Sequence, residues 1–183
     1  VRADTKLRLR GQKTVLREKN LSDAARDYLW RTDLELARLD AVTPLAMPFA
    51  QYFLNYAEEL KYLDSARRFA IEDGEGKHIG NCMYYDVDEE AGDAELGILI
   101  GDRDYWSKGY GRDAVTTLIN YIFSATCLDR IYLRTLQTNF RAQRCFRRCG
   151  FVESGHLSRD GYDFIILEMG RSQWQKVAAA TQG

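Results

Sequence analysis

The sequence predicts an α+β fold, in which helices pack against a mostly antiparallel sheet. Helical patterns fill most of the first third of the chain, and strand-like runs with two further helical stripes follow. Two pairs of neighbouring strand-like runs are joined by polar, glycine-containing loops, which is typical of hairpins. The chain has 183 residues, of which 45% are hydrophobic and 29% charged, so we expect one globular domain.

The first third is expected to begin with a strand and continue as helices. Residues Thr14–Glu18 alternate as a strand does, and Asn20 or Ser22 then offers an N-cap for a helix. Residues 33–61 follow as one or two further helices, which are interrupted where the only two prolines of the chain stand.

The middle of the chain predicts strands and then a long helix. A strand near Arg68–Glu72 precedes the runs His78–Val87 and Ala94–Ile100, which form a hairpin around the acidic loop Asp88–Asp93. After Asp102 the pattern becomes helical. Its single apolar stripe consists of Ala114, Val115, Leu118, Ile119, Ile122 and Phe123.

The last third predicts a strand, a helix and a closing hairpin. The strand is Ile131–Leu136, and the helix after it ends at Gly150. The hairpin pairs Phe151–Leu157 with Tyr162–Glu168, and the terminus from Val177 is expected to fray. The buried face of the helix is marked by Ala142, Cys145, Phe146 and Cys149.

Charge and cysteine usage exclude several functions. The net charge of −1 argues against nucleic-acid binding, and no apolar run approaches the roughly 20 residues of a membrane span. The four cysteines and two histidines have no ligand-like spacing, so no metal is expected. Cys145 and Cys149 are expected to be small core residues, with a redox pair or half a zinc site as the alternative. Unpaired cysteines and a charged first ten residues without a signal-peptide pattern indicate a cytoplasmic protein.

The segment Trp106–Arg112 carries the clearest chemistry. Gly109 and Gly111 lie two apart where the long helix opens, so the backbone can approach a ligand closely and present N–H donors. These donors and the positive end of the helix dipole suit a phosphate group. Neither a Walker loop nor a dinucleotide-binding fingerprint matches this spacing. The alternative is that the two glycines only make a turn.

The surrounding motifs resemble the GCN5-related N-acetyltransferase (GNAT) superfamily. Ala94–Asp102 with Tyr105–Gly111 resembles its central motif, and Asn139–Ala142 with Cys149–Phe151 resembles its NxRA…GF segment. The resemblance extends from Thr14 to Glu168 and is strongest to the RimJ/RimL-like branch of ribosomal-protein N-terminal acetyltransferases. It implies the GNAT fold, a mixed and mostly antiparallel sheet of about six to seven strands flanked by helices.

The resemblance also divides the single domain of residues 1–183 into parts. Residues 14–67 would supply the first strand and the acceptor-side helices, and residues 68–137 the central sheet with the cofactor-binding loop and helix. Residues 138–170 would form the C-terminal helix and hairpin, and residues 171–183 a tail.

The same resemblance implies a binding site for acetyl-CoA. The segment Trp106–Arg112 would hold the pyrophosphate, the strand edge Ile98–Ile100 would pair with the pantetheine arm, and Asn139 would hydrogen-bond to the arm or the phosphates. Arg141, Arg144 and Arg148 share a helical face suited to the 3′-phosphate, although an exposed face is an equal alternative. The full set of expected cofactor residues is Ile98, Leu99, Ile100, Trp106, Ser107, Lys108, Gly109, Tyr110, Gly111, Arg112, Asn139, Ala142 and Phe146.

The sequence departs from the family at the position of the catalytic acid. Phe146 stands where relatives often have a tyrosine, and Ala142 where some have a serine. Either the thiolate leaves without a side-chain acid, or the protein binds acyl-CoA as a sensor with little catalysis. A thiol pKa of about 8.5 favours the first interpretation.

Glu95 is the expected general base, and Asp93 is a weaker candidate that would act through water. The alternatives for Glu95 are a solvent-facing position or pairing with a nearby arginine. We therefore expect an acetyl-CoA-dependent N-acetyltransferase that acts in a ternary complex, without metal or covalent intermediate. Its acceptor is a protein N-terminus or a small amine such as a polyamine or aminoglycoside. The acidic hairpin loop could steer such a cation, with a solvated turn as the alternative. The oligomeric state is open, although sheet edges of this fold often form homodimers.

Overall fold

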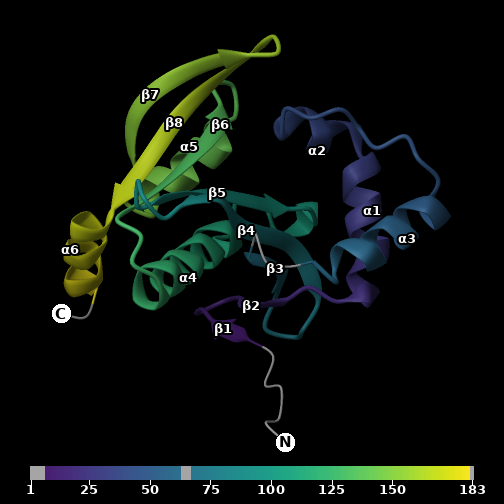
Figure 1. Ribbon diagram of the computed structural model, residues 1–183, viewed down its shortest axis with the longest axis horizontal. Coiled ribbons are helices and arrows are strands. Elements are labelled where there is room, and N and C mark those ends of the chain that lie inside the picture. The colour runs from purple at the N-terminus through teal and green to yellow at the C-terminus, as the bar shows by residue number, and fades with distance from the viewer. Residues whose placement is uncertain (1–6, 63–66, 182–183) are drawn as a thin grey trace, which may run out of the picture.

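The computed structural model describes residues 7–62 and 67–181, which form one mixed sheet with helices on both faces (Figure 1). The strands lie side by side in the order β1-β2-β3-β4-β5-β6-β8-β7. Neighbours are antiparallel everywhere except between β5 and β6, which are parallel. The bounds are β1 Arg8–Arg10, β2 Val15–Glu18, β3 Arg67–Glu72, β4 His78–Asp88, β5 Asp93–Ile100, β6 Arg130–Leu136, β7 Val152–Arg159 and β8 Tyr162–Gly170.

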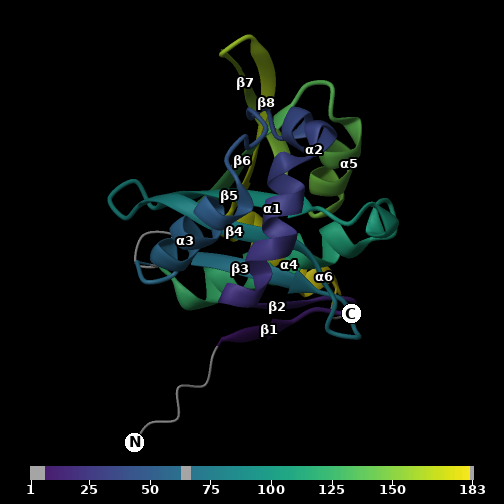
Figure 2. The same ribbon diagram turned by 90° about the vertical axis from the view of Figure 1, so that its right-hand side faces the viewer.

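The described residues also contain six α-helices and two short 3-10 turns. Helices α1 and α3 cover one face of the sheet, and α4 lies against the opposite face (Figure 2). The helices are α1 Ala24–Thr32, α2 Leu34–Leu39, α3 Phe49–Glu59, α4 Tyr110–Ala125, α5 Phe140–Arg148 and α6 Arg171–Thr181, and the turns are η1 Leu21–Asp23 and η2 Arg103–Tyr105.

The predicted α+β class, strands and helices are confirmed. The apolar stripe of α4 is buried in full against the sheet, as its three- and four-residue spacing predicts. Asn20 caps the turn before α1 by accepting a hydrogen bond from the Ser22 N–H at 2.9 Å.

Two elements depart from the expectation. The sheet has eight strands rather than six to seven, because the charged segment Arg8–Arg10 pairs with β2 and Arg8 contacts the Glu72 carboxylate at 2.8 Å. The expected tail instead begins with helix α6. Arg171 donates to the Phe123 and Thr126 carbonyls at the end of α4, and the Trp174 ring packs 5.3 Å from that of Phe123. Both elements depend on partners far away in the sequence.

The sheet opens between its two parallel strands. Only Asp93, Ala94 and Glu95 of β5 pair with β6, while β5 continues to Ile100 with β4 as its one strand neighbour. β6 instead follows β8 along its full length, up to Leu136. One edge of the last five residues of β5 is therefore left without a strand partner.

The remaining expectations on assembly and location are not tested by the fold. The outer strands of the sheet are β1 and β7, and a homodimer through a sheet edge stays a prediction. Among the described helices, none has both the length and the apolar composition that crossing a membrane requires.

Candidate active site

A cavity of about 490 Å³ lies where β5 and β6 part, between the end of β5, the start of α4 and helix α5. Its volume is in the range of ligand pockets. All but two of the residues predicted to bind the cofactor line it, and we call it the cofactor cavity. These residues are Ile98, Leu99, Ile100, Trp106, Ser107, Gly109, Gly111, Arg112, Asn139, Ala142 and Phe146.

The start of α4 offers uncapped backbone donors to this cavity. Gly109 precedes the helix with a φ of 89°, and no side chain caps the first turn. Ser107 also has a positive φ, of 59°, so the loop turns its backbone sharply twice. The Trp106 indole donates to the Ile100 carbonyl at 2.6 Å, which ties the loop to the end of β5. The geometry suits an anionic group at the helix N-terminus.

Lys108 and Tyr110 are the two predicted residues that do not line the cavity. The Lys13 ammonium donates to the Lys108 carbonyl at 3.1 Å and lies 5.4 Å from the centre of the Tyr110 ring. That ring also packs against Tyr105, with 4.8 Å between the ring centres. These contacts hold the outer side of the loop.

Helix α5 forms a basic wall of the cofactor cavity. The Asn139 amide oxygen caps α5 by accepting from the Ala142 N–H at 3.2 Å, so this oxygen already has a donor. The Arg141 guanidinium lies 3.3 Å from the centre of the Trp106 ring, and Arg144 and Arg148 also line the cavity. Cationic side chains of this kind can hold a phosphate group.

No proton donor stands at the expected position of the catalytic acid. Phe146 is buried and packs against Phe151, with 6.2 Å between the ring centres. Tyr105 is the only tyrosine among the described residues that line this cavity. Its hydroxyl donates to the Asp73 carboxylate at 2.6 Å, and this hydrogen bond raises the pKa of Tyr105.

Glu95 lies at the point where the strands part and is paired with an arginine. Its side chain is buried, and Arg134 donates from Nε to the Glu95 Oε1 at 2.9 Å and from a second nitrogen to Oε2. Asp93, the weaker candidate base, pairs with Arg130 at 2.6 Å. Glu95 does not line the cofactor cavity. Pairing with an arginine was the alternative for Glu95, and its role as base stays a prediction.

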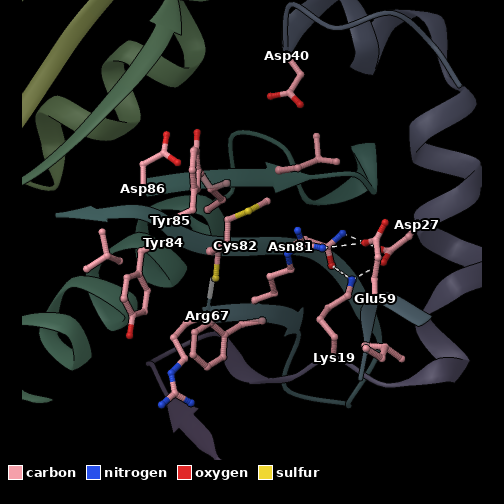
Figure 3. Close-up of a pocket in the computed structure, with 18 of the residues that line it drawn as sticks. Lys19, Asp27, Asp40, Glu59, Arg67, Asn81, Cys82, Tyr84, Tyr85 and Asp86 are labelled. Atoms are coloured by element: carbon pink, nitrogen blue, oxygen red, sulfur yellow. Dashed lines mark hydrogen bonds and ion pairs between the residues drawn. The ribbon is translucent and has the colours of Figure 1, made fainter. Parts of the chain in front are cut away.

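A second cavity of about 1630 Å³ opens on the face of the sheet that α1 and α3 cover, and we call it the acceptor-side cavity (Figure 3). The aromatic side chains Trp30, Tyr52 and Tyr56 line it. Its acidic residues are Asp27, Asp40, Glu59, Asp86 and Glu89, and its basic residues are Lys19, Arg31, Arg67 and Arg68.

Some of these charges neutralise one another. Lys19 pairs with Asp27, and the Asn81 amide donates to the same carboxylate at 2.7 Å (Figure 3). Arg68 pairs with Glu59 at 2.9 Å. Three carboxylates that line the cavity form no ion pair with any described residue, and these are Asp40, Asp86 and Glu89.

Two further residues of the site differ from the sequence analysis. Cys149 is a core residue as expected, but Cys145 is only half-buried and lines the cofactor cavity. Its hydrogen bond with Cys149 lowers the pKa of Cys145. Asp40 lines both cavities, and sequence reasoning missed it. It follows α2 in a segment without a motif, so no local signal marks it.

The family model of the acetyltransferase (GNAT) domain matches residues 13–152. The chain belongs to the GNAT acetyltransferase family. This confirms the GNAT resemblance and the expectation of an N-acetyltransferase. The finer assignment to the RimJ/RimL-like branch stays a prediction.

Some relatives of this GNAT chain have names that state a substrate, and those substrates are small amines. An uncharacterized N-acetyltransferase p20 of Bacillus licheniformis is 29% identical over 80% of this chain and 83% of its own length. The spermidine N(1)-acetyltransferase of Vibrio cholerae is 32% identical over 51% of this chain, and the match spans about half of that relative (54%). Among solved structures, the spermidine N-acetyltransferase of Vibrio cholerae with CoA and spermine has a TM-score of 0.79 at 22% identity, over 88% of this chain and 98% of that one.

Gly111→Ala tests the cofactor cavity. A methyl group at Gly111 would lie 3.6 Å from the Cys145 sulfur and from an Ile100 side-chain carbon, which are ordinary contacts, so the fold should be unaffected or slightly stabilised. If a phosphate approaches this backbone, calorimetry should show a dissociation constant for acetyl-CoA raised at least tenfold, about 1.4 kcal/mol.

Gly155→Ala is the matched control, because a methyl group there also makes an ordinary contact, 3.7 Å from Ile166, away from the cofactor cavity. It should leave the affinity unchanged. Unchanged affinity in a folded Gly111→Ala variant would remove the phosphate assignment.

Alkylation of cysteines gives a second readout of the same cavity. Cys145 lines it, whereas Cys127 is exposed and does not. Acetyl-CoA at ten times its dissociation constant should slow labelling of Cys145 by about tenfold, because only the free protein presents the thiol. Mass spectrometry of labelled peptides measures both sites in one sample. Equal labelling of Cys145 with and without acetyl-CoA would place the cofactor elsewhere.

Stability measurements test the ion pair at Glu95. Glu95→Gln leaves the Arg134 guanidinium without its buried anion and should lower the free energy of unfolding by about 2 kcal/mol. Asp93→Asn removes an exposed pair on the same strand and should lower it by less than about 1 kcal/mol. Urea denaturation measures the free energy of unfolding of both variants. Equal losses in the two variants would contradict a larger contribution of the Glu95 ion pair to stability.

Proposed function

We propose that this GNAT protein transfers the acetyl group of acetyl-CoA directly to a primary amine of a small polycation, within a ternary complex. One observation carries the proposal. The cofactor cavity and the acceptor-side cavity meet over β5, where both are lined by Ile98, Leu99 and Asp40. A thioester held in the first cavity would therefore face an amine held in the second, and this proximity is a large part of the catalysis.

The residues of the cofactor cavity fit acetyl-CoA. The uncapped N-terminus of α4 would bind the pyrophosphate, and Arg141, Arg144 and Arg148 of α5 would bind the remaining phosphate. The unpaired edge of β5 would hydrogen-bond to the pantetheine arm. Because the Ile100 carbonyl already accepts from Trp106 and Leu99 pairs with Asn81 of β4, this contact would fall on the backbone of Ile98.

The charges of the acceptor-side cavity favour a polycation over a peptide as the acetyl acceptor. A peptide N-terminus brings one positive charge, whereas a polyamine carries several along a chain. The three carboxylates without an ion pair can each attract one ammonium group, and the aromatic rings of Tyr52, Tyr56 and Trp30 line the same cavity. The relative from Vibrio cholerae whose name gives spermidine as substrate supports the same class.

Proton transfer to the leaving group needs little help from this protein. Phe146 and Ala142 cannot donate, and the Tyr105 hydroxyl is bound to Asp73. A thiolate whose conjugate acid has a pKa of about 8.5 can leave near neutral pH without a strong acid. The attacking amine instead has to lose a proton before it becomes a nucleophile.

An acceptor panel tests the proposal. Thiol release from acetyl-CoA is measured with spermidine, with a monoamine of similar chain length, and with a peptide that has a free N-terminal alanine. We expect saturable release with spermidine and a kcat/KM at least tenfold above that of the monoamine, because only spermidine reaches more than one carboxylate. A higher kcat/KM for the peptide would overturn the choice of acceptor, and no release with any amine would indicate a binding module.

The double variant Asp86→Asn with Glu89→Gln tests the acidic wall itself. It should raise the KM for spermidine by about fivefold, which corresponds to about 1 kcal/mol of exposed ion pairing. The KM for the monoamine, which needs one carboxylate, should change less. An equal change for both amines would contradict recognition of a polycation by these residues.

A further inference from the structure

Asp40 occupies a position that no other titratable residue shares within the described chain. The cofactor cavity and the acceptor-side cavity have three lining residues in common, and the other two, Ile98 and Leu99, are apolar. An acetyl group and an amine that react across this junction would therefore meet beside the Asp40 carboxylate.

The surroundings of Asp40 leave its carboxylate available. It is the residue that ends α2, and its backbone N–H bonds to the Leu36 carbonyl at 3.0 Å, while its side chain forms no hydrogen bond or ion pair with a described residue. Figure 3 shows this side chain projecting from the end of α2 into the space over the sheet. Asp40 is an exposed residue, yet the protein packed on one side of its carboxylate raises the pKa of Asp40 to about 6 by partial desolvation.

Glu95 lacks each of these properties. It lines neither cavity, and Arg134 holds both of its carboxylate oxygens. A proton acceptor has to lie within hydrogen-bond reach of the proton it removes, or within reach through one water. The geometry places Asp40, and not Glu95, beside the path between the cavities.

We infer that Asp40 accepts the proton of the acceptor ammonium group in the transfer reaction. This inference rests on the proposed function. The N–H bond of the ammonium breaks and the proton passes to the Asp40 carboxylate, from which it leaves to water. The amine then forms the C–N bond to the thioester carbon, the C–S bond breaks, and a second amine proton ends on the CoA sulfur. Acetyl-CoA and the ammonium thus give the amide, CoA thiol and one proton.

The charges around Asp40 fit this task. Arg31 of α1 is the cation that acts on it, and it favours the ionised carboxylate. Across the cofactor cavity stand Arg141, Arg144 and Arg148 of α5, which the phosphates of the cofactor would neutralise. Only the ionised carboxylate can accept a proton, and it is present above the raised pKa. The rate should therefore fall as the pH drops through about 6.

The experiment compares the pH dependence of kcat/KM in wild type, Asp40→Asn and Glu95→Gln, with spermidine as acceptor. Wild type should show a rising limb with an apparent pKa near 6 and a plateau above it. Asp40→Asn should lower kcat by about 10²-fold and lose this limb, so that its rate climbs until the free amine titrates above about 9. Asp40→Glu should restore the limb, and Glu95→Gln should keep it.

Each other outcome overturns the inference in a distinct way. If Asp40→Asn raises only the KM and keeps kcat and the pH profile, Asp40 is a binding group. If Glu95→Gln loses the limb and Asp40→Asn keeps it, the base is Glu95. If wild type acts on spermidine and Asp40→Asn matches it throughout, Asp40 has no part in the reaction while the proposed function stands. Absence of acceptor-dependent thiol release in wild type overturns both.

Discussion

The ion pair between Glu95 and Arg134 stands at the point where the sheet opens, and both cavities depend on that opening. β5 and β6 pair only as far as Glu95 and Tyr132, and Arg134 lies two residues further along β6. Its guanidinium reaches back to both oxygens of the Glu95 carboxylate. A two-point contact of this kind is directional, so it fixes how the two strands lie as they part. Beyond it the edge of β5 is free to meet a ligand.

Sequence reasoning predicted the features that depend on residues close together in the chain. The apolar stripe of α4 and the glycines at its start each follow from spacing within a few positions, and each appears as expected. That the end of β5 and the start of α4 share one cofactor site was implied by the resemblance to the family. The resemblance to the family then joined them to α5, which lies about thirty residues further on.

The features that were missed depend on distant partners. Neither the residue type nor the spacing of Asp40 marks it in the sequence. Its position matters only because α2 ends where the two cavities meet. For Glu95 the sequence offered pairing with an arginine only as an alternative, because the pairing with Arg134 depends on the register of the parallel strands. Helical spacing predicted Cys145 in the core. Spacing alone does not reveal that one side of α5 faces the open part of the sheet, where Cys145 is only half-buried. Helix α6 likewise exists because Arg171 reaches the end of α4.

The junction is asymmetric in a way that matches the chemistry of an amine and a thioester. An ammonium group with a pKa above about 9 is not a nucleophile until it loses a proton, so a proton acceptor beside it speeds the reaction. The departing thiolate is stable near neutral pH, so a donor beside the sulfur adds less. The structure has a free carboxylate, Asp40, on the acceptor side and the apolar Phe146 in the cofactor cavity. An oxygen-ester donor would fit this arrangement less well, because its leaving alkoxide would need the proton donor that Phe146 cannot supply. With the proposed roles of Asp40 and Phe146, we therefore expect this site to favour an amine acceptor and a thioester donor.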